Sequence, residues 1–557
     1  MKMKLIYTIL LASAGAVAFT RCNNEALNVT PTNIISDAAI TADSALFEDF
    51  VINRYMGARL QDKEAEGTNP GFGRGFEYAL WASITDESIY NSDDNTWLVQ
   101  QGNLAPENTG ITGTIWSRSY RSIRECNYAL SKIDQVKMSA AHKQLLVAEL
   151  KFIRAYRYHD LIRNYGQIVL IGDKVYGLSD NFTDPAMFKK STIAEGMNYI
   201  TGQLDEAAAD LPSQNNSGWT LGRATRGAAL ALKARLLLYA ASPLYNAGTW
   251  QAAADAAQAV LNLSYSLHPD YRSLFLTPSS GEIIFERLYV KNARHVCLEI
   301  SNAPNGYGGW AGNSPMQNLV DAYEVKVDAN TSVPFDWNNT THAQAPYDNR
   351  DPRFYATILY NGADYRGRKI ETFLPGGKDS KDGRDNWNTS KTGYYLYKFI
   401  DNNLPIDNPW DVAGTQPWIY LRYAEVLLNY AEAKNEASGP DASVYSAINM
   451  IRQRAGMPTL PAALSQSDMR QRIRNERQVE LAFEEHRFYD VRRWKIAMDT
   501  ENVPAYGISI TKDNLNNLTY ARKTALTRKF EEKHYWLPIP RAEIQSSGGI
   551  LEQSPLY

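Results

Sequence analysis

Two loop-like stretches of the sequence combine flat aromatic side chains with short polar ones. One stretch spans residues 81–97 and the other residues 302–317. Indole and phenol rings can stack on the apolar C–H face of a pyranose, while carboxylate and amide groups can bind its hydroxyls. We therefore predict a carbohydrate-contacting surface built from both stretches. The candidate contact residues are Trp97, Trp310, Tyr307, Asn95, Asp86, Tyr90 and Asn313.

The surroundings of the tryptophans predict different degrees of exposure. Trp310 is flanked by Gly308, Gly309 and Gly312. Because glycine adds no side chain beside the indole, we predict that Trp310 stands out from the surface, where an exposed aromatic ring marks a contact site. For Trp81 and Trp97 the alternative is burial as anchors of their own loop, since tryptophan is frequently largely buried.

Carboxylates in the first stretch raise hydrolysis as an alternative. A glycoside hydrolase on a helical scaffold would use acids such as Asp86 or Asp93, and it needs two carboxyl groups on opposite sides of the scissile bond. The acids here occur in adjacent runs, which are more typical of solvated turns or of a Ca²⁺ site. The sequence also contains no GxxxxGK[ST] loop, HExxH motif or GxSxG elbow. We therefore predict a non-catalytic protein without a resident metal, and Ca²⁺ is kept as the one cofactor alternative.

Composition supports a binding role without suggesting nucleic acid as the partner. The formal net charge is −3 over 557 residues, which gives no electrostatic attraction to nucleic acid or to anionic lipid. Tyrosine is twice as frequent as phenylalanine, 34 against 17, and there are 12 tryptophans. Rings with a polar tip suit wet binding surfaces, although most of these tyrosines are expected in helix packing. The chain is too long for a single hydrophobic core, so several lobes or an extended helical array are expected.

The N-terminus has the pattern of a bacterial lipoprotein. Lys2 and Lys4 precede an apolar run from residue 5 to residue 19, which is too short to span a bilayer comfortably. Cys22 follows this run, at the position that lipoprotein processing acylates. We therefore predict a signal peptide over residues 1–21, a lipid anchor at Cys22 and a polar tether over residues 22–33. The alternative is cleavage after Ala18, which would leave a free periplasmic protein.

The rest of the chain divides into helical and loop-rich parts. Helical apolar spacing predicts a scaffold over residues 34–265 and 418–557, and alanine where helices cross is typical of tetratricopeptide-like hairpins. Residues 266–417 are rich in Gly, Asn, Asp and Pro with short alternating segments, which predicts a loop-rich insertion with short strands. The predicted fold is therefore mainly α. Its expected helices span residues 38–60, 116–133, 139–165, 192–211, 224–245, 250–263, 420–434 and 441–455.

Charged residues on the C-terminal helices are predicted to pair with one another. They are Glu425, Glu432, Glu480, Glu484, Arg422, Arg477 and Arg487. Their helical spacing favours internal ion pairs that hold helices together over an acid–base catalytic pair.

Ordered sequence blocks along nearly the whole mature chain carry a family resemblance. They occupy residues 116–127, 148–156, 226–235, 314–323, 420–434, 448–458, 473–494, 536–540 and 553–557. In order and spacing these blocks resemble the SusD/RagB family of outer-membrane nutrient-binding lipoproteins.

The resemblance implies a fold, a location and a partner. It implies a helical, tetratricopeptide-like protein anchored at the outer membrane and facing the cell exterior. Such a protein would capture oligosaccharide and deliver it to a SusC-like TonB-dependent transporter. Trp97, Tyr307 and Trp310 match the regions that carry the family's binding aromatics. Within the family, a peptide ligand of the RagB kind is the alternative to a glycan.

Overall fold

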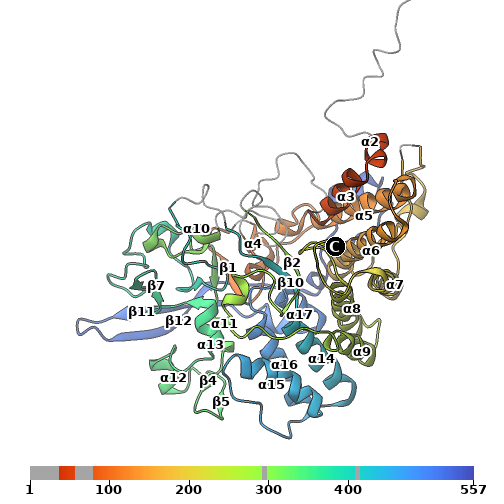
Figure 1. Ribbon diagram of the computed structural model, residues 1–557. Helices are drawn as coiled ribbons and strands as arrows, with labels where there is room; N and C mark the ends of the chain where they lie inside the picture. The colour runs from red at the N-terminus through yellow and green to blue at the C-terminus, as the bar shows by residue number, and fades with distance from the viewer. Residues whose placement is uncertain (1–36, 57–78, 94, 178, 291–297, 408–413) are drawn as a thin grey trace, which may run out of the picture.

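The computed structural model describes residues 37–56, 79–93, 95–177, 179–290, 298–407 and 414–557 (Figure 1). The predicted signal peptide, tether and acylated Cys22 lie outside the described residues, as does Cys297. Cys126, the remaining cysteine, is a buried free thiol within helix α5 (Ile115–Lys132). Among the described residues, no helix combines the length and the apolar character that crossing a bilayer requires.

Antiparallel helices form one lobe, seen on the right in Figure 1. They are α5 (Ile115–Lys132), α6 (Ala140–Tyr165), α7 (Ile193–Asp210), α8 (Arg226–Ala241) and α9 (Trp250–Leu261), and each packs on the next. Short helices α2 (Asp37–Ala42) and α3 (Ser44–Ile52) precede them, and α3 packs on α6. Local chemistry sets the ends: the Ser139 hydroxyl caps α6, whereas Gly166 ends it at φ +69°.

Helices from the end of the chain complete this array. They are α14 (Tyr423–Ser438), α15 (Ala442–Arg454) and α16 (Gln466–Glu480). Helix α14 packs on α8 and α9 as well as on α15 and α16, so two hairpins that are far apart in sequence form one stack. The predicted mainly helical, tetratricopeptide-like fold is confirmed. The remaining C-terminal helices are α17 (Arg487–Arg493), α18 (Ala497–Thr500) and α19 (Arg541–Ser546).

The other lobe, on the left in Figure 1, consists of short elements and loops, mostly from residues 266–417 with additions from residues 88–100 and 505–526. The strands of the described residues pair two by two and antiparallel. The pairs are β1 (Ser88–Tyr90) with β3 (Asn313–Pro315), β2 (Ile283–Arg287) with β10 (Trp418–Arg422), β4 (Val325–Lys326) with β5 (Ser332–Val333), β6 (Ile358–Leu359) with β9 (Tyr395–Leu396), β7 (Asp364–Tyr365) with β8 (Arg368–Lys369), and β11 (Ala505–Lys512) with β12 (Leu518–Leu526). The helices of this lobe are α4 (Thr96–Gln100), α10 (Leu298–Asn302), α11 (Gln317–Ala322), α12 (Thr340–Gln344) and α13 (Pro352–Thr357).

The hairpin of β11 and β12 departs from the predicted helical scaffold over residues 418–557. Ile508 and Ile510 are buried while Ser509 between them is partly exposed, which is the period of a strand rather than of a helix. Asp513 closes the turn, since its carboxylate accepts hydrogen bonds from the backbone N–H groups of Leu515 and Asn517, both at 2.8 Å. Residues 420–422 likewise belong to strand β10, and the helix that was expected from Tyr420 begins at Tyr423.

Buried ion pairs join the two lobes. Arg422 contacts Glu282 at 2.7 Å, Glu480 at 2.7 Å and Glu484 at 2.6 Å. Arg353, from the insertion, contacts Glu476 at 2.6 Å on α16. The predicted internal ion pairing of the C-terminal helices is therefore confirmed, although the partners include residues of the insertion. Glu425 pairs with Arg235, Glu432 with Arg493, and Arg477 with Asp490.

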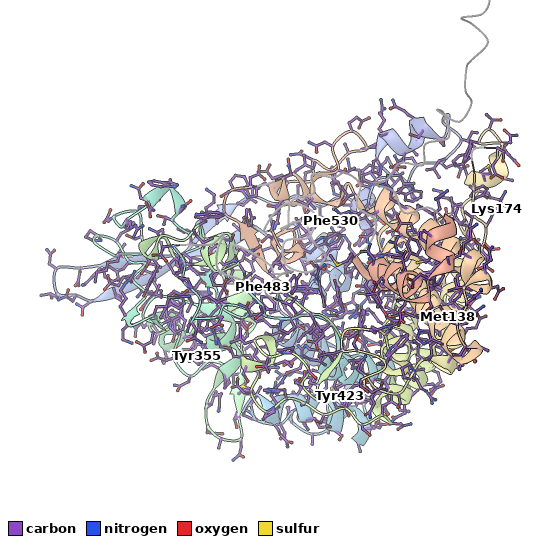
Figure 2. All side chains as sticks on the ribbon, turned by 45° about the horizontal axis from the view of Figure 1, so that its top comes forward. Met138, Lys174, Tyr355, Tyr423, Phe483 and Phe530 are labelled. Carbon is purple, nitrogen blue, oxygen red and sulfur yellow. The ribbon has the colours of Figure 1, made fainter. Side chains whose placement is uncertain are left out.

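Phe483, just after α16, lies near the middle of the molecule (Figure 2). Its side chain is fully buried and belongs to the apolar cluster of the insertion lobe. The second large apolar cluster fills the helical lobe. The segment that follows α16 thus packs into the insertion lobe directly after a helix of the helical array, and it connects the two lobes.

Candidate ligand-binding face

Strand pairing brings the two aromatic stretches of the sequence together. In the β1–β3 ladder Tyr90 lies opposite Asn313. The backbone N–H of Asn91 extends the contact by donating to the carbonyl of Gly312 at 2.7 Å. The loop that follows β1 and the loop that precedes β3 therefore lie side by side, although more than 200 residues separate them.

A third loop, residues 378–391, completes this face. The Asn91 amide donates to the carbonyl of Thr389 at 3.2 Å and accepts from the backbone N–H of Lys391 at 3.0 Å. On the other side, the Asn305 amide donates to the carbonyl of Arg384 at 2.7 Å. We call the surface formed by residues 91–93, 95–97, 305–312 and 384–391 the loop face. The side chains of Asn91 and Asn305 hold these loops together through the hydrogen bonds described above.

Trp97 and Asn95 lie on the loop face. The Trp97 ring is half-buried, its indole N–H donates to the carbonyl of Tyr90 at 2.9 Å, and the Lys391 ammonium lies 5.2 Å from the ring centroid. Asn95 is exposed and adopts a left-handed conformation just before α4. Both positions are compatible with ligand contact, and their binding role stays a prediction.

Trp310 is half-buried, which corrects the expectation that its glycines hold it away from the surface. These glycines instead allow close backbone contacts. A Cβ on Gly309 would lie 2.2 Å from the carbonyl oxygen of Ala303, and one on Gly312 would lie 2.6 Å from that of Ser301. The loop before β3 is therefore folded tightly against α10. The side chain of Trp310 remains partly accessible, and its contact with a ligand stays a prediction.

Tyr307 contributes a ring whose polar end is already used. Its hydroxyl donates to the carbonyl of Tyr365 at 2.5 Å, and the Arg368 guanidinium lies 4.0 Å from the ring centroid. Burial raises the pKa of Tyr307 to about 12. The remaining ring surface could contact a ligand, but the hydroxyl is committed to the fold.

Three of the predicted contact residues are buried, so the expectation that they reach the surface is wrong. Asp86 forms a two-pronged ion pair with Arg487, at 2.8 and 2.7 Å. The side-chain amide oxygen of Asn313 accepts from the Leu80 backbone N–H at 2.9 Å and from the Ser83 hydroxyl at 2.8 Å. Tyr90 is only 3% exposed. These side chains position the loops, because a polar group that is buried in a protein needs a partner within it.

Trp81 also belongs to the interior, in agreement with the alternative of a buried anchor. Its ring is 0% exposed and packs on Phe488 and Tyr489, with centroid distances of 4.8 and 5.6 Å. The early loop is thus fastened to α17 both by this aromatic contact and by the Asp86–Arg487 pair.

Trp387 is the contact candidate that the sequence-based prediction missed. It lies in a short 3₁₀ turn (Asn386–Asn388) of the loop face and is 76% exposed. A tryptophan exposed to this degree is unusual, since its large apolar surface favours burial. Trp387 lies between two asparagines in a loop rich in Asp, and this polar setting is the signal by which the sequence could have pointed to an exposed ring.

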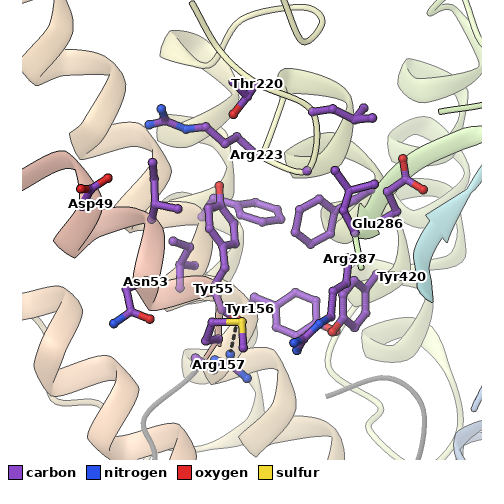
Figure 3. A pocket seen from close by; sticks show the side chains of 18 residues that line it. Asp49, Asn53, Tyr55, Tyr156, Arg157, Thr220, Arg223, Glu286, Arg287 and Tyr420 are labelled. Carbon is purple, nitrogen blue, oxygen red and sulfur yellow. Dashed lines mark hydrogen bonds between the residues drawn. The ribbon is translucent and has the colours of Figure 1, made fainter. Parts of the chain in front are cut away.

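A large pocket lies elsewhere, between the helical lobe and strands β2 and β10 (Figure 3). Its volume is about 530 Å³. Five aromatic rings line it, and Phe285 stacks on Tyr420 with a centroid distance of 5.6 Å. The five are Tyr55, Phe152, Tyr156, Phe285 and Tyr420. No sequence pattern marked this pocket, because its rings come from four separate segments.

Polar groups surround the aromatic wall of this pocket. Figure 3 shows Thr220 and Arg223 above it, Asp49 and Asn53 on one side and Arg157 below. The pocket shares no lining residue with the loop face, so the molecule offers two separate aromatic sites. An aromatic wall with a polar edge can hold a sugar ring, which makes the pocket a second place for the predicted ligand.

Among the described residues, no group of three or more His, Cys, Asp or Glu side chains could hold a metal ion. Asp94, next to Asp93, lies outside them. The Ca²⁺ alternative therefore stays a prediction.

Comparison with known proteins identifies the fold. A family model described as the SusD family matches residues 282–557. A second model, described as starch-binding associating with outer membrane, matches residues 72–238. The chain belongs to the SusD family.

Relatives and solved structures share this fold over most of the chain. SusD-like protein P2 of Formosa agariphila is 24% identical over 86% of this chain and 90% of its own. A crystal structure of a SusD-like protein from Bacteroides fragilis has a TM-score of 0.77 at 28% identity, covering 95% of this chain and all of that one. A SusD-like carbohydrate binding protein from the same species has a TM-score of 0.76 at 24% identity, covering 92% and 99%.

Proposed function

We propose that this SusD-family protein is a non-catalytic, cell-surface glycan-binding lipoprotein. The observation that carries the proposal is the loop face, where the exposed indole of Trp387 lies in the same surface as the partly exposed rings of Trp97 and Trp310. Flat rings on loops that hydrogen bonds hold in place suit stacking against sugar rings with a reduced loss of conformational entropy on binding. The similar SusD-like carbohydrate binding protein of B. fragilis supports the same ligand class.

The state of the two candidate acids near this face supports binding without cleavage. A general acid needs a raised pKa and access to substrate. Asp86 has neither: burial opposes its charge, but Arg487 outweighs this, so the pKa of Asp86 lies below its usual value. The other candidate acid, Asp93, accepts the backbone N–H of Trp97 at 2.9 Å as part of a turn.

Anchoring and delivery complete the proposal. An acylated Cys22 would hold the protein at the outer membrane, which agrees with the description of the second matching family model. We propose that the bound oligosaccharide passes from there to a SusC-like TonB-dependent transporter. Co-purification of such a transporter from solubilised outer membranes tests this step.

Glycan binding is tested by affinity electrophoresis and calorimetry against plant, microbial and mucin polysaccharides. Trp387→Ala and Trp310→Ala should each weaken binding by roughly 1–3 kcal/mol, the scale for loss of a central aromatic contact. Phe182→Ala is the control, because Phe182 is an exposed aromatic (49%) of the helical lobe. A large fall in melting temperature with unchanged affinity would instead assign the tryptophan to the core.

A second variant tests whether glycan binds at the loop face or in the aromatic pocket. Leu221→Asp places a charge at the edge of the pocket, at a side chain that is already 39% exposed. Loss of binding in this variant, with normal binding by Trp387→Ala, would move the site to the pocket. Release of reducing sugar would contradict the non-catalytic proposal. Absence of binding to every glycan tested would favour the peptide alternative.

A further inference from the structure

A second sizeable cavity lies where α9, α14 and α16 meet. Its volume is about 380 Å³, and its walls include Trp250, Trp494, Ile473 and Arg474. Figure 1 shows these helices toward the lower side of the molecule, away from α4 and β1 on the upper side. This cavity is therefore separate from the loop face, and nothing in the proposed function uses it.

Charge is unbalanced around this cavity. Four arginines and three carboxylates meet here. Each carboxylate already has its own guanidinium: Glu432 with Arg493 at 2.7 Å, Asp490 with Arg477 at 3.0 Å, and Glu436 with Arg470 at 2.6 Å. Trp494 also donates its indole N–H to Glu432 at 2.7 Å. One positive charge, that of Arg474, is left over.

Arg474 differs from the other arginines of the cavity. It forms no ion pair and no hydrogen bond with any residue that the structure describes. Its guanidinium lies 4.8 Å from the centroid of the Trp494 ring, and its Nε is buried without a partner. Burial lowers the pKa of Arg474, in keeping with a cation that is partly withdrawn from water. A shielded charge without a counter-ion is costly, so such groups normally meet one.

We propose that this cavity binds a carboxylate carried by an apolar group, with Arg474 as the anion-binding residue. A guanidinium offers a planar fork of N–H donors that matches the two oxygens of a carboxylate. Trp250 and Ile473 supply the apolar wall for the attached group, and the volume suits a ligand of small-molecule size. Such a carboxylate has two sources, a free organic acid or the C-terminus of a protein chain.

Calorimetry on the chain from residue 23 onward tests the site with N-acetyl-leucine and with N-acetyl-leucinamide. The two probes share the apolar group, but only the first carries the carboxylate. We expect the acid to bind and the amide to bind at least about tenfold more weakly, the scale of a charge-assisted hydrogen bond. Equal binding of the two probes, or no binding of the acid, would overturn the proposal, and neither outcome depends on a variant that must fold.

The variant Arg474→Gln should weaken binding of N-acetyl-leucine at least about tenfold and leave the melting temperature nearly unchanged, because it removes no ion pair or hydrogen bond within the described residues and only the contact with the Trp494 ring is lost. Lys434→Gln is the matched control: it removes one positive charge from the neighbouring α14, where Lys434 contacts Asp441 at 3.7 Å. Unchanged affinity in Arg474→Gln would refute the assignment.

Peptides that end in leucine distinguish the two sources. Affinity that rises with peptide length would identify the C-terminus of a chain, whereas equal affinity for the short acid and the peptides would identify a free acid. Trp387→Ala should leave this binding intact. The proposal of glycan binding and the proposal of carboxylate binding can therefore be refuted independently of one another.

Discussion

Replacing Glu87 by glutamine should stabilise the protein at neutral pH. Glu87 lies just before β1, beneath the loop face, and is 1% exposed. One carboxyl oxygen accepts the backbone N–H of Phe483 at 3.2 Å, and the other has no hydrogen-bond partner among the described residues. Burial, reinforced by the neighbouring charge of Asp86, raises the pKa of Glu87 to about 8.

The size and sign of the effect follow from this pKa. An unfolded glutamate has a pKa near 4.5, so at pH 4.5 it is about half protonated, and well below pH 4.5 Glu87 is protonated in both states and contributes little. Between pH 4.5 and 8 the unfolded side chain is ionised whereas the folded one retains its proton. Folding then costs about 1.4 kcal/mol more for each pH unit, which amounts to about 3 kcal/mol at pH 7. Above pH 8 the cost stays constant. Glutamine imitates the protonated acid and removes this cost.

Urea unfolding followed by circular dichroism at pH 4.5, 6, 7 and 8 measures the effect. The gain of Glu87→Gln over the native chain should be small at pH 4.5 and should grow to about 3 kcal/mol at pH 7. Glu107→Gln is the control for loss of a carboxyl group at an exposed position (53%). A difference that does not change with pH, or a variant that is less stable at every pH, would refute the reasoning.

Two further predictions concern anchoring and the loop face. Cys22→Ala should release the protein from membranes into the soluble fraction; if the variant still fractionates with membranes, a lipid on Cys22 is not what holds it. Gly309→Ala should displace the loop that carries Trp310 and weaken polysaccharide binding, because its Cβ would meet the Ala303 carbonyl at 2.2 Å. Gly202→Ala, within α7 and with no atom inside 4 Å, should leave binding unchanged and raise stability by up to about 1 kcal/mol. Unchanged binding by Gly309→Ala would show that this backbone contact does not position the indole.

The helical part of the fold could be predicted because its signals are local. Apolar spacing, the Ser139 cap and the Gly166 stop fix α6 within one residue of the expected bounds. The β11–β12 hairpin was missed because a helical scaffold was extended over the whole C-terminal part, although Ile508 and Ile510 alternate with polar residues.

The loop face was harder to predict because its residues depend on distant partners. Asp86 looked available in the sequence, but Arg487, which binds it, lies 401 residues further along the chain. Asn313 looked equally available, and its partners are in the early loop. Composition can therefore find the loops that meet, but which side chains point outward is decided by contacts that the sequence does not display.

The ion pair between Asp86 and Arg487, called the clasp below, has a consequence for folding during synthesis of the chain. The β1–β3 ladder needs residue 315, and the clasp needs residue 487. A growing chain can stack its first helices early, yet its loop face takes shape only when synthesis is nearly complete. Fragments that stop before α17 would keep helical hairpins but lack an ordered loop face.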